Sequence, residues 1–269
     1  MTVDPRILRR AARAMVESDL LLGLDAVPLG AAPPVTTTSA PLKEKVKAPD
    51  QSAAVPVPAS GGGAEPLMPA ADPDSLGSDA DSRLEELERR HAGSCRHCAG
   101  STTHQFMVFG EGDSDAEIMF VGEAPGAEED QVGRPFVGRA GELLDRMIDS
   151  VGLSRSAVYM ANVMKVRPPE NRTPRPEECR ICGPWLLSQI AVVRPRVIVT
   201  LGATPTRYLL GTSTGITRLR GGRVDIEIGG IPFPVVPTFH PAYVLRQYTT
   251  EVRRAVWEDL KQAVAISGE

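Results

Sequence analysis

Long hydrophobic runs are missing from this chain of 269 residues. None approaches the ~20 apolar residues that a helix needs to span a bilayer. The longest early run, Leu20 to Leu22, follows Glu17 and Asp19, which does not resemble the apolar centre of a secretory signal. We therefore expect a cytoplasmic protein that makes no contact with a membrane.

Aromatic residues are missing from residues 26–80, a segment rich in Ala, Pro, Ser and Gly. Such a segment cannot bury enough apolar surface to offset the entropy of ordering it, so we predict a disordered linker. Residues 5–25 have apolar side chains at roughly helical spacing, which fits a short helix within residues 1–25 or a weakly structured tail equally well. The folded domain is then predicted at residues 81–269, and the tail is a possible docking site for a protein partner.

An excess of basic residues is absent as well. The formal net charge is −4, and residues 94–269 carry as many acidic as basic side chains. A neutral domain still binds DNA if its cations gather on one face. The charge therefore neither predicts nor excludes a nucleic-acid partner.

Strand and helix patterns alternate from residue 117 onward. Alternation of this kind predicts an α/β three-layer sandwich with a central, mainly parallel, four-stranded sheet. In such sheets the functional site lies beyond the carboxyl ends of the strands. A helix at 81–92, with Gly93 as its C-cap, is predicted before this region. The predicted strands are 118–121, 158–163, 197–201 and a hairpin of 224–228 with 231–236, and the later helices are 140–151, 176–193, 203–210 and 250–265.

Two glycine-containing motifs follow the first strand. Gly122–Gly126 comes directly after it, and glycine and proline let a backbone turn approach a ligand closely. An ordinary strand-to-loop turn explains this segment equally well. In the next motif, Gly133–Gly138, Phe136 stands between a proline and a glycine. Its ring either stacks on a planar base or, as is commoner for a single phenylalanine, belongs to the core.

Two further motifs follow later strands. Asn162 carries both donors and an acceptor, so it can read a base edge, although a turn or cap role is also open. His240 stands where it can donate to a developing oxyanion, although a lone histidine is usually structural. The segment 241–246 has apolar and cationic tips of the kind that wedge into a duplex.

Together these motifs resemble the family 4, thermophile-type, iron–sulfur uracil-DNA glycosylases. The resemblance runs from Cys95 to Val264 and is carried by GEAPG followed by ED, RPFVG, NVMK-x-RPP-x-NRTP and HPAYVLR. It implies the uracil-DNA glycosylase-like fold and a monofunctional enzyme of base excision repair. Such an enzyme hydrolyses the N-glycosidic bond of a flipped-out uracil through an oxocarbenium-like state. A glycosylase for a broader set of deaminated bases, or a non-catalytic DNA-binding replication or repair module, remains the alternative.

The resemblance also implies roles for individual residues. Glu123 is the expected catalytic acid that positions water, with Glu129 as a second candidate. Phe136 stacks on uracil, Asn162 reads its edge, and His240 stabilises the charge on O2. The expected uracil-binding set is Gly122, Glu123, Ala124, Phe136, Asn162 and His240.

The expected partner is uracil-containing DNA, single- or double-stranded, bound by a monomer in the cytoplasm at a bacterial-type nucleoid. Basic and apolar residues of the third and fourth motifs are the predicted contacts with this DNA. They are Arg167, Arg172, Tyr243, Leu245 and Arg246.

The four cysteines form two C-x-x-C pairs, which in a cytoplasmic chain indicates a metal site rather than disulfides. The resembled family places its third cluster cysteine directly after the lysine of the third motif, where this chain has Val166. Cys179 lies one helical turn before Cys182, so both sulfurs can face one side. Spacing alone favours a tetrahedral zinc site, whereas the resemblance implies a 4Fe–4S cluster, which we predict with zinc as the alternative. The predicted ligands are Cys95, Cys98, Cys179 and Cys182.

Overall fold

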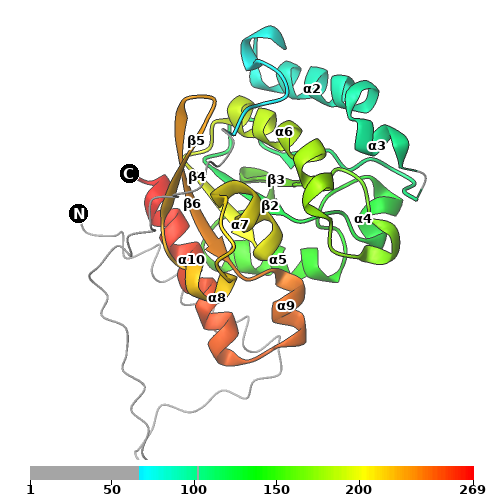
Figure 1. The fold of residues 1–269 in the computed structure, drawn as a ribbon. Helices are drawn as coiled ribbons and strands as arrows, with labels where there is room; N and C mark the ends of the chain where they lie inside the picture. Colours follow the sequence, from blue (N-terminus) through cyan, green and yellow to red (C-terminus); the bar gives the residue numbers. More distant parts are fainter. Residues whose placement is uncertain (1–66, 102) are drawn as a thin grey trace, which may run out of the picture. The chain divides into compact units, whose positions relative to one another are not determined.

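The computed structural model describes residues 67–101 and 103–269, so the predicted tail helix and most of the predicted linker lie outside the described residues. The described part contains a six-stranded sheet with the order β1-β3-β2-β4-β6-β5. Figure 1 shows the sheet between helices. The strands are β1 Glu111–Gly112, β2 Ile118–Gly122, β3 Tyr159–Asn162, β4 Val197–Leu201, β5 Val224–Ile228 and β6 Ile231–Thr238.

The centre of this sheet is parallel. Strands β3, β2, β4 and β6 pair in parallel, which confirms the predicted mainly parallel sheet and its four central strands. Antiparallel edges flank these four strands: β5 comes from the predicted hairpin, and β1 was not predicted. The β5–β6 hairpin turns at Gly229 and Gly230, whose φ angles of 57° and 84° are those that glycine adopts without strain.

Helices cover both faces of the sheet, as the predicted three-layer sandwich requires. Alternate residues of β2 point to opposite faces: Met119 packs in the cluster that contains α6, and Phe120 in the cluster that contains α5 and α10. Among the described residues, no helix has the length and apolar character needed to cross a bilayer. The helices are α2 Ala80–Ser94, α3 Arg96–Gly100, α4 Ala127–Val132, α5 Arg139–Ser150, α6 Pro176–Val193, α7 Ala203–Leu210, α8 Ile216–Leu219, α9 Pro241–Arg246 and α10 Thr250–Ser267, with short 3-10 turns η1 Pro73–Ser75, η2 Arg155–Ala157 and η3 Pro169–Asn171.

The start of the folded part differs from the prediction. Leu67 forms a parallel bridge with Ile228, and the backbone N–H of Ala70 donates to the carbonyl of Pro184 at 3.1 Å. These contacts attach residues that the composition assigned to the linker to β5 and α6. Helix α2 also runs through the predicted C-cap Gly93 and ends at Ser94, because the backbone hydrogen bonding continues to Cys95.

Candidate active site and metal centre

The carboxyl ends of the parallel strands bring three of the four motifs to one edge of the sheet. Gly122 ends β2 and is in register with Asn162, which ends β3. Leu201, the last residue of β4, is in register with Thr238 of β6. His240 follows two residues later, so it stands at the same edge.

Gly122 lies between the amide of Asn162 and the ring of Phe136. A Cβ added at Gly122 would lie 2.3 Å from Oδ1 of Asn162 and 2.6 Å from Cζ of Phe136. Asn162 is only 3% exposed, yet its side-chain amide has no hydrogen-bond partner among the described residues. An aromatic ring and an uncommitted amide therefore face the same glycine, which is the arrangement that a planar, hydrogen-bonding ligand requires.

The backbone of Phe136 adopts an unfavourable conformation. Its φ of 53° lies in the left-handed region, where a non-glycine residue costs about 1–3 kcal/mol and persists only if its surroundings hold it. Arg155 supplies such a hold by donating to the carbonyls of Phe136, at 2.9 Å, and Pro135, at 2.6 Å. A Cβ at Gly141 would lie 1.9 Å from the Phe136 carbonyl oxygen, so only glycine fits beneath this loop.

Glu129, the predicted second acid, fastens two motifs together. One carboxylate oxygen accepts hydrogen bonds from the backbone N–H groups of Val137 and Gly138, and the other accepts one from Gly126. Both oxygens are therefore engaged by backbone donors. The geometry favours a positioning role for Glu129, which holds the Phe136 loop against the first motif.

Glu123, the predicted first acid, has a partner that the sequence analysis missed. The hydroxyl of Thr204 donates to Oε2 of Glu123 at 2.5 Å. Oε1 has no hydrogen-bond partner within the described part of the chain. Thr204 lies in the first turn of α7, just beyond the end of β4. The rule that sites lie beyond strand ends was the one signal that pointed to this position.

His240 caps α9 through its ring. The backbone N–H of Ala242 donates to Nδ1 at 3.1 Å, which assigns the proton of the neutral ring to Nε2. Burial lowers the pKa of His240 to about 4, the positive charge of Arg246 lowers it further, and Glu129 opposes the shift. At neutral pH the ring is uncharged and presents one N–H donor.

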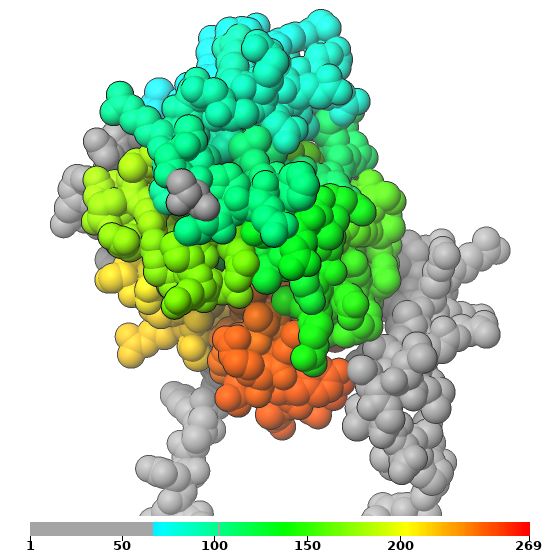
Figure 2. All heavy atoms as spheres, turned by 90° about the vertical axis from the view of Figure 1, so that its right-hand side faces the viewer, coloured from blue at the N-terminus to red at the C-terminus, as the bar shows by residue number. Residues whose placement is uncertain are grey.

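Some of the residues predicted to contact DNA already bond to other residues of the protein, and others are exposed. Arg172 forms two hydrogen bonds with Glu178, whereas Tyr243 and Arg246 are exposed on α9. Leu245 is partly buried against the core. Figure 2 shows the α9 segment, in orange, at the surface and bordering green residues of the chain. Arg167 donates to Oδ1 of Asn171 at 2.6 Å.

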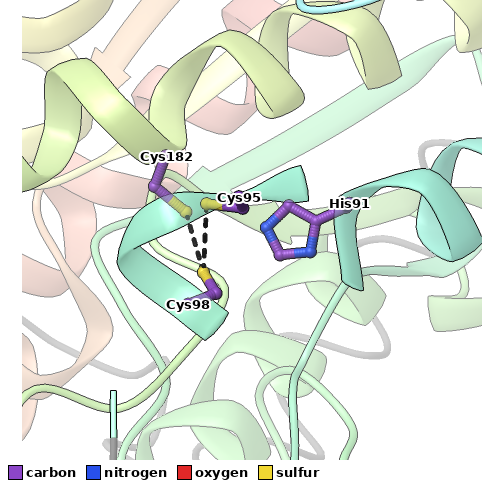
Figure 3. A group of neighbouring side chains, drawn as sticks. All are labelled: His91, Cys95, Cys98 and Cys182. Atoms are coloured by element: carbon purple, nitrogen blue, oxygen red, sulfur yellow. Dashed lines mark hydrogen bonds between the residues drawn. The ribbon is translucent and has the colours of Figure 1, made fainter. Parts of the chain in front are cut away.

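Three of the predicted metal ligands come together, and the fourth does not. The sulfurs of Cys95 and Cys98 are 3.4 Å apart, and those of Cys98 and Cys182 are 3.6 Å apart. The group that encloses them, with all ligand atoms within 4.8 Å of one another, contains His91 and not Cys179. Figure 3 shows these four side chains converging from two segments of the chain. Cys179, the fourth predicted ligand, lies outside this group; a one-turn spacing aligned it with Cys182 but could not show where α2 lies.

The pKa values of the three clustered thiols shift in opposite directions, with Cys95 lowered and Cys98 and Cys182 raised. Hydrogen bonds from Cys182 and Cys98 hold the pKa of Cys95 far below its usual value, which is the state a metal ligand needs. Burial raises the pKa of Cys179 to about 11, and the carboxylate of Glu123 adds to this.

Lys165 connects the sulfur group to the end of β3. It is fully buried, its backbone N–H donates to the sulfur of Cys182 at 3.3 Å, and its Nζ donates to the backbone carbonyl of Asn162 at 2.8 Å and to Gln189. Burial lowers the pKa of Lys165 to about 8, and the charge of Cys182 opposes this shift. The lysine of the third motif thus stabilises the end of β3 through its hydrogen bond to the Asn162 carbonyl.

Two surface hollows lie near these groups. One of about 310 Å³ borders Cys98 and Met107, beside the sulfur group. The larger, of about 620 Å³, lies around Glu111 and Arg134 and not at the strand ends. We place the candidate active site at the strand ends, because the uncommitted polar groups gather there and the Arg134 side chain is already paired with Glu111.

Comparison with known proteins identifies the family of the chain. Residues 109–261 match the profile of the uracil DNA glycosylase superfamily. The type-4 uracil-DNA glycosylase of Thermotoga maritima is 47% identical over 181 residues, which cover 67% of this chain and 93% of that protein. The enzyme of the same name from Archaeoglobus fulgidus is 42% identical over 65% of this chain and 89% of its own. That of Saccharolobus solfataricus is 43% identical over 62% and 79%.

Proposed function

The chain belongs to the uracil DNA glycosylase superfamily and, within it, to the type-4 uracil-DNA glycosylases, and from this premise we propose how its residues excise uracil from DNA. The enzyme is a hydrolase of DNA repair that acts on the N-glycosidic bond. Because its substrate is uracil-containing DNA, we propose that the enzyme acts at the nucleoid, in the cytoplasm.

The arrangement of Gly122, Phe136 and Asn162 carries the proposal. A uracil flipped out of the duplex stacks on the Phe136 ring, and the Asn162 amide pairs with its edge. Cytosine presents the opposite donor and acceptor pattern at that edge, so it leaves the amide unpaired. The side-chain amide of Asn162 has no partner among the described residues, so both its donor and its acceptor are free to pair with a base edge, which supports this assignment.

Bond cleavage is assigned to two groups on either side of the sugar–base bond. As the C1′–N1 bond breaks, its electron pair leaves with uracil, and Nε2–H of His240 stabilises the charge at O2. Glu123 faces the oxocarbenium-like sugar and accepts a proton from the water that adds to C1′. Thr204 holds one carboxylate oxygen, which leaves the other for that water.

The sulfur group is proposed to hold a 4Fe–4S cluster, with zinc as the rival. Its three buried, converging cysteines and the adjacent buried Lys165 suit an anionic, thiolate-bound group. When bound, the cluster would order the segments that carry Cys95, Cys98 and Cys182, which places its role in structure and not in electron transfer.

Replacement of Asn162 by alanine tests base recognition. We expect excision to fall about 10- to 100-fold, since a good base-edge pair is worth about 1–3 kcal/mol. The melting temperature should change little, because the amide bonds to no other described residue. Single-turnover nicking after alkali on a uracil oligonucleotide measures the rate, with the exposed Gln131→Ala as control. A near-normal rate in Asn162→Ala would remove this residue from the site.

A second variant, Gly122→Ala, tests the same site by steric closure. Its methyl group would meet Asn162 and Phe136 well inside contact distance. The Phe136 loop is held too firmly to yield, so we expect the rate to fall about 100-fold, the usual cost of a ~1 Å misplacement. Gly215→Ala, where the methyl group meets open space, should retain the wild-type rate. Full activity in Gly122→Ala would show that uracil does not enter between these residues.

The choice of base is tested on one panel of oligonucleotides. Uracil, thymine, hypoxanthine and xanthine are placed in the same sequence, in single and double strands. We expect uracil to be cut fastest, because the Asn162 amide matches its edge. Comparable rates on hypoxanthine would support the broader deaminated-base specificity.

A further inference from the structure

We propose that His91, through Nε2, is the fourth ligand of the metal group held by Cys95, Cys98 and Cys182. This inference rests on the proposed function only in that these cysteines hold a metal. The observation that carries it is the convergence of one imidazole and three thiols, all buried, within 4.8 Å. No other histidine of the described residues belongs to this group.

His91 is a buried histidine with an unpaired nitrogen. The residue is 0% exposed, and Nε2 has no hydrogen-bond partner among the described residues. Leaving such an atom unpaired is destabilising, so native proteins rarely tolerate one without a reason. A metal ion beside the ring supplies the missing partner.

The other ring nitrogen determines the protonation state. Nδ1 lies 2.8 Å from the sulfur of Met107, and a thioether sulfur only accepts hydrogen bonds. The proton of the neutral ring therefore belongs on Nδ1, and Nε2 keeps its lone pair. Metal-binding histidines are oriented in this way, with one nitrogen donating outward and the other directed at the metal. Figure 3 shows a ring nitrogen of His91 directed toward the cysteines.

Helix and core packing fix the ring in place. His91 precedes Cys95 by four residues at the end of α2, a spacing that places both on one side. The ring stands edge-on to Trp185, with centroids 5.1 Å apart, and tilted against Phe109 at 5.6 Å. The side chain is therefore held before any metal binds, which lowers the entropy that binding has to overcome.

The ligand type has a measurable consequence. Imidazole is neutral where a thiolate is negative, so a cluster with one histidine ligand carries one negative charge fewer than a cluster with four cysteines. Histidine ligation raises the reduction potential of iron–sulfur centres. We therefore expect His91→Cys to keep the cluster and to shift its reduction potential to a more negative value.

Metal analysis of the full-length protein, purified without oxygen, is the first step of the test. Iron with sulfide, or zinc without sulfide, identifies the group and tests the proposed cofactor separately. A protein with neither metal would overturn the proposed metal centre and, with it, the inference about His91. The proposal of uracil excision would still be tested separately by the Asn162→Ala assay. With iron, pulsed electron paramagnetic resonance of the reduced cluster in ¹⁵N-histidine-labelled protein reports the ligand. With zinc, X-ray absorption counts sulfur and nitrogen neighbours.

Four variants then separate His91 from Cys179. We expect nitrogen coupling, or a three-sulfur, one-nitrogen shell, in wild type and in Cys179→Ser, and its loss in His91→Cys with the metal retained. His91→Ala should bind metal at least ~10–100-fold more weakly, since even loss of an outer-shell partner costs that much, and Cys182→Ser should lose the metal. Unchanged metal and spectra in both His91 variants, or metal loss in Cys179→Ser, would overturn the inference.

Discussion

Glu123→Ala is expected to lower the single-turnover rate of uracil excision about 10²- to 10⁴-fold, the range for loss of a positioned general base. Glu123 is half-buried and its carboxylate has one hydrogen-bond partner among the described residues, Thr204. Removing it therefore leaves the core packing intact. The melting temperature and the binding of uracil-containing DNA should both stay near the wild-type values.

Glu123→Gln separates charge from shape in the same assay. The amide oxygen still accepts the Thr204 hydroxyl, but the side chain no longer takes a proton or faces the sugar cation with a negative charge. We expect a loss close to that of Glu123→Ala. A Gln variant with the wild-type rate would show that Glu123 only positions its loop, and the catalytic acid would have to be sought elsewhere.

His240→Ala is expected to lower the excision rate about 10²- to 10³-fold, as loss of one donor to a developing oxyanion does. It also removes the N-cap of α9, which costs about 1 kcal/mol of stability. His240→Asn restores a good capping side chain without the Nε2 donor. We expect it to recover the stability and not the rate. Recovery of both would reduce His240 to a helix cap.

The pH dependence follows from the pKa of His240, which is lowered to about 4. The ring stays neutral between pH 5 and 8, so we expect the excision rate to show no His240 transition near the usual histidine pKa of about 6.5. The unfolded chain takes up this proton near that usual value, and the native state only near its lowered one. His240 therefore lowers the free energy of unfolding as the pH falls through that interval. A histidine NMR titration of the wild type and Arg246→Ala measures the shift directly, and an ordinary His240 pKa would contradict it.

The sequence predicted those features that depend on a few neighbouring residues, such as strand ends and the hairpin turn. Strand ends are marked by the change from apolar runs to glycine and polar residues, so Gly122, Asn162 and His240 were predicted at one edge of the sheet, and the structure places them there. The hairpin at residues 229–230 was predicted for the same reason. β1 is only two residues long, too short for any periodicity, so the sheet was predicted without it.

The remaining site features depend on contacts between distant segments. The sequence identifies Glu129 as a carboxylate but not that backbone N–H groups near residue 137 engage it. Thr204 meets Glu123 across 81 residues, and His91 meets Cys182 across the packing of α2 on α6. Spacing along one helix suggested Cys179, and only the position of a second helix reveals that His91 lies beside Cys95, Cys98 and Cys182 instead.

The hydrogen bonds that fix the Phe136 loop involve, on the loop's side, only its main-chain atoms. Glu129 receives N–H groups, Arg155 donates to carbonyls, and no side chain within the loop takes part in these four bonds. The position of the Phe136 backbone is thus set by residues outside the loop. The Phe136 ring can therefore be replaced by another aromatic ring without loss of these hydrogen bonds. A glycosylase built in this way can vary the aromatic side chain that faces the base while the backbone that carries it keeps its position.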